Sequence, residues 1–417
     1  MPPAPRRPEV ATAGRSSRLG LYHLLDPAVL ADPYPLYRQL REEAPVLWDP
    51  YLHTWVVTRY QDVEQVLRSF KAARTPGPDR LAALGLERLT PVARMMVRQM
   101  LFLDQPAHGR VRRLASVAFT PRQVAKLRDD IAGITDGLLD GRPERDRIEI
   151  MSQLAEPLPA IVTARMLGVP TEHHQMLKAW SQDFAEMLGN FQHNPGRVDK
   201  VLASVEEMGA YFTDAVRRDA LEPTDGLIHA LASAEVDGDQ LDEEDLVANI
   251  VVTMVGGQET TTNLIGNGLM TLLRHPGTLE ALRSDPELLP SAVEELLRYE
   301  SPSQHTARLA PAGAVLGGQE IPEDAAVMAV MGAANRDPER FADPDRLDLA
   351  RQDNRHLAFG WAAHFCFGAP LARLEGQVVL GALAAKFKEI TLDAEHLAWR
   401  PNLGLRGLTA LPVKVTS

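Results

Sequence analysis

The stretch HLAFGWAAHFCFGAPLARLEG, residues 356–376, places the single cysteine of the chain, Cys366, in a glycine-containing loop directly ahead of a helix-forming run. A lone cysteine cannot form an internal disulfide or a zinc site of several cysteines. Glycines allow tight turns that direct backbone N–H groups at a sulfur atom, and a helix that starts near Gly368 would bring its positive end close to Cys366. The local sequence therefore favours an anionic sulfur that acts alone, although a free cysteine is more often a small buried apolar residue.

This stretch resembles the haem-binding signature of the cytochrome P450 family, F-G-x-G-x-H-x-C-x-G-x-x-L-A-R. The residues that match it in register are Phe359, Gly360, His364, Cys366, Gly368, Leu371, Ala372 and Arg373. The one departure is Ala362, where the family usually has glycine, and it leaves the ligand in place. The resemblance implies haem b as the cofactor and the Cys366 thiolate as the iron ligand. The residues that it implies around the haem are Phe359, Gly360, His364 and Gly368.

A long, largely apolar helix is predicted for DLVANIVVTMVGGQETTTNLIGNGLMTLLRH, residues 245–275. Gly256 and Gly257 would each destabilise it by about 1 kcal/mol relative to alanine, so they mark either a functional site or a place where another helix packs closely. The segment resembles the P450 motif A/G-G-x-D/E-T. By that resemblance Glu259 is the acid and Thr260 the alcohol of a proton relay to bound dioxygen, whose O–O cleavage consumes two protons. Gly256 would leave room for the dioxygen.

A third P450-like element, E-x-x-R, is formed by Glu295 and Arg298 in PSAVEELLRYE. Taken alone, a pair three residues apart on a helix is usually a surface ion pair that contributes roughly 0.2–0.5 kcal/mol. The resemblance adds Arg340, in PERF at 338–341, as the third member of a buried charge cluster that braces the cysteine loop. We therefore assign these three residues a structural role.

The two propionates of a haem require cationic donors, because a carboxylate buried without a partner is costly. His108 and Arg112, in DQPAHGRVRR, are four residues apart on a predicted helix and fit the family's H-x-x-x-R. Arg308, in HTARLA, fits the arginine that follows the E-x-x-R helix, and His364 completes the set. Each residue taken singly is more simply a solvated surface group. Their order along the chain is what predicts propionate binding.

The sequence predicts a mainly α protein with a minor β portion, which is the cytochrome P450 fold. A short helix is expected in DPYPLYRQLREEAP (32–45) and two strands in residues 45–60. Helices are expected over most of the segment 62–309, with Asp242 as the N-cap of the long apolar helix. Short strand candidates such as AAVMAV (325–330) follow.

Bulk properties place the chain among folded enzymes, since its 417 residues are 45% hydrophobic and 24% charged. The formal net charge of −12 disfavours binding to nucleic acid. The N-terminal stretch lacks the apolar core of a signal peptide, and no apolar run reaches the roughly 20 residues that span a bilayer. We therefore expect a cytoplasmic protein with no membrane partner. We expect a flexible N-terminal tail over residues 1–20 and a single haem domain over residues 21–417.

Substrate contacts are expected from the variable segments around the haem. By position in the family pattern, the candidates are Val252, Val255 and Gly256 on the long helix and Gln304 and His305 after the E-x-x-R helix. Two loops, 73–91 and 191–196, are expected to form a lid. Arg74, His193 and His305 are candidates for binding a polar or acidic group, although each is more simply a solvated loop residue.

The resemblance also implies separate electron donors, a ferredoxin and its reductase, that dock on the face nearest Cys366. The arginines expected to give that face local positive charge are Arg110, Arg113, Arg122 and Arg373.

The implied activity is that of a monooxygenase that uses dioxygen to oxidise a small organic molecule, as in the tailoring of natural products. Three alternatives stay open. They are the oxidative coupling of two aryl carbons without oxygen insertion, a peroxide-driven haem-thiolate enzyme, and a non-catalytic P450-like protein that binds a partner enzyme. The last would be expected to lack the ligand cysteine or the acid–alcohol pair, and this chain keeps both.

Overall fold

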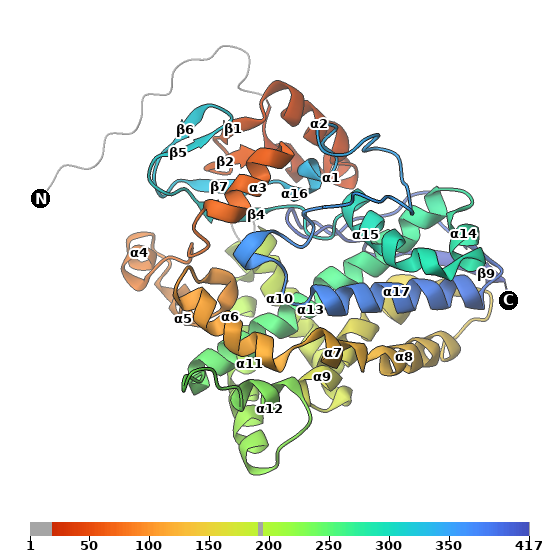
Figure 1. Ribbon diagram of the computed structural model, residues 1–417, viewed down its shortest axis with the longest axis horizontal. Helices are drawn as coiled ribbons and strands as arrows, with labels where there is room; N and C mark the ends of the chain where they lie inside the picture. The colour runs from red at the N-terminus through yellow and green to blue at the C-terminus, as the bar shows by residue number, and fades with distance from the viewer. Residues whose placement is uncertain (1–18, 191–194, 417) are drawn as a thin grey trace, which may run out of the picture.

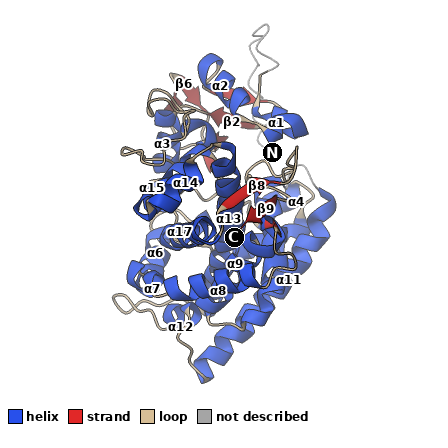
Figure 2. Ribbon diagram, turned by 90° about the vertical axis from the view of Figure 1, so that its right-hand side faces the viewer, coloured by secondary structure: helices blue, strands red, loops and turns tan. Residues whose placement is uncertain are grey.

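Helices make up most of the protein, and small sheets form the rest (Figures 1 and 2). The computed structural model describes residues 19–190 and 195–416. The α-helices of this part of the chain are α1 (Pro27–Ala31), α2 (Tyr34–Glu43), α3 (Tyr60–Ser69), α4 (Pro78–Ala83), α5 (Thr90–Met96), α6 (Ala107–Ala118), α7 (Pro121–Ala125), α8 (Arg128–Asp140), α9 (Pro157–Leu167), α10 (His174–Asn190), α11 (Val198–Leu221), α12 (Leu227–Ala232), α13 (Glu243–Arg274), α14 (Thr278–Ser284), α15 (Leu289–Tyr299), α16 (Met331–Ala334) and α17 (Ala369–Lys386). The predicted mainly α architecture is confirmed. None of the helices in the described residues has both the length and the apolar character needed to cross a bilayer.

The strands form three small sheets. They are β1 (Val46–Asp49), β2 (Thr54–Val57), β3 (Arg147–Glu149), β4 (Thr306–Leu309), β5 (Ala314–Leu316), β6 (Gln319–Ile321), β7 (Ala326–Ala329), β8 (Glu389–Leu392) and β9 (Pro412–Thr416). Their orders are β1-β2-β7-β4, β3-β9-β8 and β5-β6. β1 and β2 form the hairpin predicted for residues 45–60, with Val46 opposite Val57. β7 lies within the predicted strand AAVMAV and runs parallel to β2.

β3 departs from the expectation of helix over most of residues 62–309. It pairs with β9 near the C-terminal end of the chain, with Ile148 opposite Val413. A strand of three residues is too short to show an alternating pattern, so its own sequence does not reveal it. The pairing fastens the C-terminal end of the chain to the helical part of the protein.

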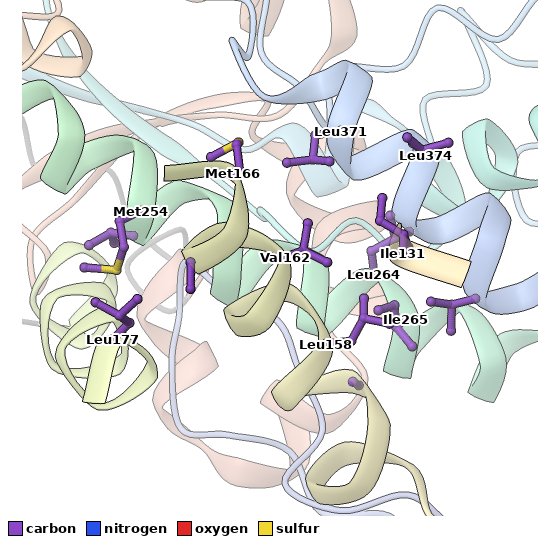
Figure 3. Close-up of a cluster of buried hydrophobic side chains, with 14 of the residues drawn as sticks. Ile131, Leu158, Val162, Met166, Leu177, Met254, Leu264, Ile265, Leu371 and Leu374 are labelled. Carbon is purple, nitrogen blue, oxygen red and sulfur yellow. The ribbon is translucent and has the colours of Figure 1, made fainter. Parts of the chain in front are cut away.

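α13 is a 32-residue helix that passes through the core (Figure 3). The predicted N-cap is confirmed, because the Asp242 carboxylate accepts the backbone N–H of Asp245 at 2.7 Å. The helix packs against α9, α10, α11, α15 and α17. Figure 3 shows Met254, Leu264 and Ile265 of α13 among side chains of α9 and α17. A helix that is apolar on most of its faces is stable only when it is enclosed in this way.

A buried ion pair joins α15 to the segment that precedes the cysteine loop. Glu295 and Arg298 are fully buried, and Arg298 Nε and Nη2 each donate to the Glu295 carboxylate at 2.8 Å. The same carboxylate accepts from Arg351 Nε at 3.1 Å, from Asn354 Nδ2 at 3.1 Å and from the Asp348 N–H at 2.9 Å. A buried carboxylate requires such partners. The segment that supplies them is therefore held against α15.

The prediction that Arg340 completes this cluster is wrong. Arg340 pairs with Asp353 at 2.8 Å, and the Asp353 side chain is mostly exposed. Arg351 binds Glu295 instead. The PERF pattern matched Arg340 to the family by sequence alone, whereas Arg351 is the residue whose side chain reaches the buried carboxylate.

Replacement of Arg351 by glutamine is expected to destabilise the protein by about 3 kcal/mol, because it leaves the buried Glu295 carboxylate short of a charged partner. Arg340→Gln removes a partly exposed ion pair and is expected to cost less than about 1 kcal/mol. Urea unfolding of the two variants beside the unaltered protein measures both losses. Equal losses would contradict the assignment of Arg351 to the cluster.

Candidate functional site

Cys366 lies in a tight loop between Phe359 and the start of α17. The Cys366 N–H donates to the Phe359 carbonyl oxygen at 2.8 Å. Gly360 has φ of +70°, a left-handed conformation that glycine adopts without steric cost. The backbone N–H groups of Gly368 and Ala369 hydrogen-bond to the sulfur, as the glycine-containing sequence predicts.

Burial nevertheless dominates the acidity of this sulfur. Burial raises the pKa of the Cys366 thiol, and the N–H groups of Gly368 and Ala369 and the charges of Arg112 and Arg373 offset only part of that shift. The N–H groups of the loop therefore favour the anionic sulfur, as predicted, but they do not outweigh burial. In this environment the neutral thiol is the stable form until a metal cation binds the sulfur.

Ala362, the departure from the family signature, also has a left-handed backbone, with φ of +55°. Its side chain is exposed and therefore gains little from packing. A non-glycine residue in this region costs about 1–2 kcal/mol. The usual glycine of the signature is thus explained by the backbone conformation of the loop, and this chain tolerates alanine there under strain.

Four cationic or imidazole side chains gather near the loop: His108, His364, Arg308 and Arg74. The ring centres of His108 and His364 lie 4.1 Å apart. His108 Nε2 and Arg308 Nε are buried and find no hydrogen-bond partner among the described residues. Burial and the charges of Arg308 and His108 lower the pKa of His364 to about 3. Burial lowers the pKa of Arg308 to about 10 and, with the Arg308 charge, that of Arg74 to about 9.

This donor group fits the two carboxylates of a haem. Buried N–H groups without partners are costly, and like charges held together repel one another. Two anionic groups would relieve both costs. His108, Arg308 and His364 were predicted for this role from the sequence, whereas Arg74 was predicted as a residue that binds a polar or acidic group of the substrate. No motif marks Arg74, because only the folded chain brings it to Arg308.

Arg112 contacts the cysteine loop directly. Its Nη2 donates to the Phe365 carbonyl oxygen at 2.9 Å, and its guanidinium lies 5.1 Å from the ring centre of Phe367. It therefore contacts both chain neighbours of Cys366, one helical turn after His108.

One face of α13 is open around Gly256. Val252, Gly256 and Thr260, each four residues apart, are exposed or half-exposed. A Cβ added at Gly256 would meet no atom of the described residues within 4 Å, whereas one at Gly257 would lie 3.3 Å from Thr163 Oγ1. Close helix packing therefore explains Gly257 but not Gly256. Thr260 Oγ1 donates to the Gly256 carbonyl oxygen at 2.9 Å, and the helix remains unbroken here.

Glu259 belongs to a network of ion pairs behind this face. Its buried carboxylate pairs with Arg400 Nη1 at 2.7 Å. Arg400 also pairs with Glu156, which in turn binds Lys178. Burial raises the pKa of Glu259, and the Arg400 charge opposes this shift only in part. Arg400, Glu156 and Lys178 come from separate parts of the chain, and no sequence motif marks them.

Two of the predicted substrate contacts are placed elsewhere. Val255 is 4% exposed and belongs to the main hydrophobic cluster, away from the open face of α13. The side-chain amide of Gln304 accepts from Tyr37 Oη at 2.9 Å and donates to the Ser301 carbonyl oxygen at 2.7 Å. Gln304 is therefore a brace between distant segments, because both ends of its amide are occupied.

His305 is half-buried and hydrogen-bonds to the backbone of Leu403. Burial lowers the pKa of His305 to about 4, so its imidazole is neutral at pH 7. It can offer a hydrogen bond to a substrate, but it cannot pair as a cation with an acidic one. Of the predicted lid, residues 73–91 contain α4 and the start of α5, while residues 191–194, including His193, lie outside the described residues.

The predicted docking arginines fall into two groups. Arg110 pairs with Asp239 and Asp245, and Arg373 pairs with Glu294, so these charges are neutralised locally. Arg113 and Arg122 are exposed. Of the four arginines predicted to give this face positive charge, two are therefore neutralised by acidic partners and two are exposed.

Comparison with known proteins identifies the family. The cytochrome P450 family model matches residues 46–396. The chain is 39% identical to cytochrome P450 107B1 of Saccharopolyspora erythraea over 404 residues, which cover 93% of this chain and 96% of the relative. It is 33% identical to the polyketide biosynthesis cytochrome P450 PksS of Bacillus subtilis, with 92% and 96% covered. The crystal structure of P450BioI in complex with a hexadec-9Z-enoic acid ligated acyl carrier protein matches with a TM-score of 0.86 at 34% identity, covering 93% of this chain and 99% of that chain.

The chain therefore belongs to the cytochrome P450 family and has the P450 fold. It is an oxidoreductase of the P450 monooxygenase class. Members of this family bind a haem whose iron is ligated by a cysteine thiolate.

Ala362→Gly is expected to stabilise the protein by about 1 kcal/mol, because glycine removes the left-handed strain and no buried contact is lost. Ala363→Gly is the matched control, since it alters the next exposed residue of the same loop, which has no positive φ. The control is expected to lower stability by roughly 0.5–1 kcal/mol. Thermal unfolding of both variants measures the difference, and a destabilised Ala362→Gly protein would contradict the strain argument.

Proposed function

We propose that the protein is a haem-thiolate monooxygenase that uses dioxygen to oxidise a small organic molecule, as a tailoring step in natural-product biosynthesis. The observation that carries the proposal is the buried Cys366 in its glycine-containing loop, beside the buried donors of His108 and Arg308, which have no hydrogen-bond partner among the described residues. The open face of α13 at Gly256 adds to it. The likeness to a polyketide biosynthesis P450, and to a P450 crystallised with a fatty-acyl carrier protein, supports a substrate of polyketide or fatty-acyl type. We also propose that residues 21–417 form one haem domain, which the pairing of β3 with β9 supports. The tail predicted for residues 1–20 falls almost wholly on residues 1–18, which lie outside the described residues.

In this proposal haem b is held by two sets of residues. Cys366 ligates the iron, and Phe359, Gly360 and Gly368 shape the loop around the sulfur. The residues that would bind the propionates are His108, Arg112, Arg308 and His364, joined by Arg74. The bound haem supplies an iron at which dioxygen is bound and cleaved, with electron donation from the thiolate.

Thr260 and Glu259 supply the protons in this proposal. The Thr260 hydroxyl lies on the open face and donates to the Gly256 carbonyl oxygen. Rotation of its O–H would let it pass this proton toward an oxygen atom held beside the helix, while its own oxygen accepts a replacement proton. Glu259 is the neighbouring acid, and burial raises its pKa toward the range in which a carboxyl both takes up and releases protons near neutral pH. The ion pairs through Arg400 and Glu156 to Lys178 connect this acid to more exposed side chains.

Electrons come from a separate ferredoxin and its reductase in this proposal. A chain with one cysteine cannot hold a four-cysteine iron–sulfur cluster of its own. The exposed Arg113 and Arg122 give the face near Cys366 positive charge for such a partner.

The absorption spectrum of the reduced protein under carbon monoxide tests the proposal. The unaltered protein is expected to show the strongly red-shifted Soret band of a thiolate-bound haem. Cys366→Ser is expected to lose that band while keeping its fold, because the serine oxygen cannot replace the electron donation of the sulfur. A protein that binds no haem would instead support the non-catalytic partner role.

Thr260→Ala is expected to lower product formation driven by ferredoxin, its reductase and dioxygen by about 100-fold, the scale of a lost proton-transfer group. Thr253→Ala is the matched control, because the Thr253 hydroxyl also donates to a carbonyl oxygen one turn earlier on α13, at 2.7 Å. Peroxide-driven turnover is expected to survive in Thr260→Ala. Equal dioxygen-driven turnover in both variants would contradict the relay and favour the peroxide-driven alternative.

A further inference from the structure

The carboxylate of Glu294, next to Glu295 on α15, contacts both ends of the cysteine loop. Its oxygens accept from Arg373 Nε at 2.7 Å and from Arg373 Nη2 at 2.8 Å, which is a two-pronged ion pair. His356 Nε2 lies 3.2 Å from the same carboxylate. His356 opens the HLAFG stretch before Cys366, and Arg373 lies one turn into α17 after it. The Glu294 side chain therefore links the segment before Cys366 to the segment after it.

Arg373 transmits this contact to the interior of the loop. Its guanidinium lies 4.7 Å from the ring centre of Phe359, a cation–π contact. The Phe359 carbonyl oxygen accepts the Cys366 N–H at 2.8 Å. The path from Glu294 to the residue that carries the sulfur thus passes through Arg373 and Phe359 only.

His356 fixes the other end of the loop through a defined tautomer. The Ala358 N–H donates to His356 Nδ1 at 3.2 Å, so Nδ1 carries no proton and the ring proton is on Nε2. Nε2–H then donates to Glu294. The His356 side chain is 2% exposed, so water does not replace Glu294 as its partner. Both ring nitrogens are used, and the backbone just before Phe359 is held in place.

The pKa of Glu294 agrees with strong binding of its carboxylate by His356 and Arg373. Burial alone would raise its pKa, but the hydrogen bonds from His356 and Arg373 and the charge of Arg373 outweigh burial and lower the pKa to about 2. A carboxyl with a pKa below its usual value contributes stability above that usual value, and the contribution is lost as the pH falls toward the folded-state pKa. The Glu294 carboxyl is therefore ionised at neutral pH and keeps its contacts with Arg373 and His356.

Glu294 and Glu295 divide the bracing of the loop between them. Glu295 binds Arg351, Asn354 and the Asp348 N–H, all of which precede the loop. Glu294 contacts the two sides of the loop itself.

We propose that Glu294 is a positioning residue that clamps the two ends of the Cys366 loop and so holds the sulfur in the place from which it would bind the iron. This inference rests on the proposed function, because the ligand role of Cys366 belongs to it. Glu294 does not touch the sulfur and acts through Arg373, Phe359 and His356.

Glu294→Gln tests the clamp, since glutamine keeps the size of the side chain but loses the charge that holds Arg373. The red-shifted Soret band of the reduced carbon monoxide complex is expected to decay roughly 10-fold faster than in the unaltered protein, because a charge-assisted pair is lost. Hydrogen exchange of the Cys366 amide, followed by mass spectrometry, is expected to accelerate to a similar extent with or without haem.

Glu280→Gln is the matched control, because it removes another glutamate–arginine pair, with Arg283 on α14, far along the chain from the loop. It is expected to leave both readouts unchanged.

If the red-shifted band decays and the Cys366 amide exchanges in Glu294→Gln at the rates of the unaltered protein, the clamp is overturned. If Glu294→Gln unfolds globally, Arg373→Lys replaces it, since lysine keeps the charge and loses the two-pronged geometry, and unchanged rates there would also overturn the proposal. Absence of the red-shifted band from the unaltered protein would instead refute the proposed function, while the exchange measurement would still report on the clamp.

Discussion

A carboxylate without access to solvent governs the structure around the cysteine. Glu295 is fully buried, and a buried carboxylate is stable only when cationic and N–H groups surround it. Its own helix supplies Arg298, and a segment much later in the chain supplies Arg351 and two further donors. Because this later segment must reach the Glu295 carboxylate, the chain immediately before the cysteine loop is held against α15. The position of the sulfur thus depends on a buried carboxylate of α15.

α13 satisfies two requirements that oppose each other. It packs against several helices in the core, which favours an apolar helix without defects, yet it leaves one face open at Gly256. The polar groups near that face are accommodated by local bonds. Thr260 uses a carbonyl oxygen of its own helix, and the buried Glu259 finds a cation in Arg400. The helix therefore stays continuous at Gly256.

Local patterns predicted most of the fold, and the failures were contacts between distant segments. Periodicity identified the long helix and the hairpin because those signals lie within a few residues of one another. The cysteine motif likewise placed its loop and the helix after it. A motif could not show that Arg351 rather than Arg340 reaches Glu295, that Gln304 is held by Tyr37, or that Arg74 approaches Arg308. Each of these depends on how separate segments pack together.

The groups around the site carry two electrostatic costs, one relieved by a cation and the other by anions. Burial favours the neutral form of the Cys366 thiol, so the sulfur becomes an anion only beside a cation. Arg308 and His108 bury N–H groups that have no acceptor among the described residues, and burial together with the charge of Arg308 lowers the pKa of His364. That side of the site is stabilised by anions. A metal cation at the sulfur and carboxylates at the donors would relieve both costs together, and a haem joins these two groups in one molecule. The folded chain is therefore complementary to haem in charge as well as in motif.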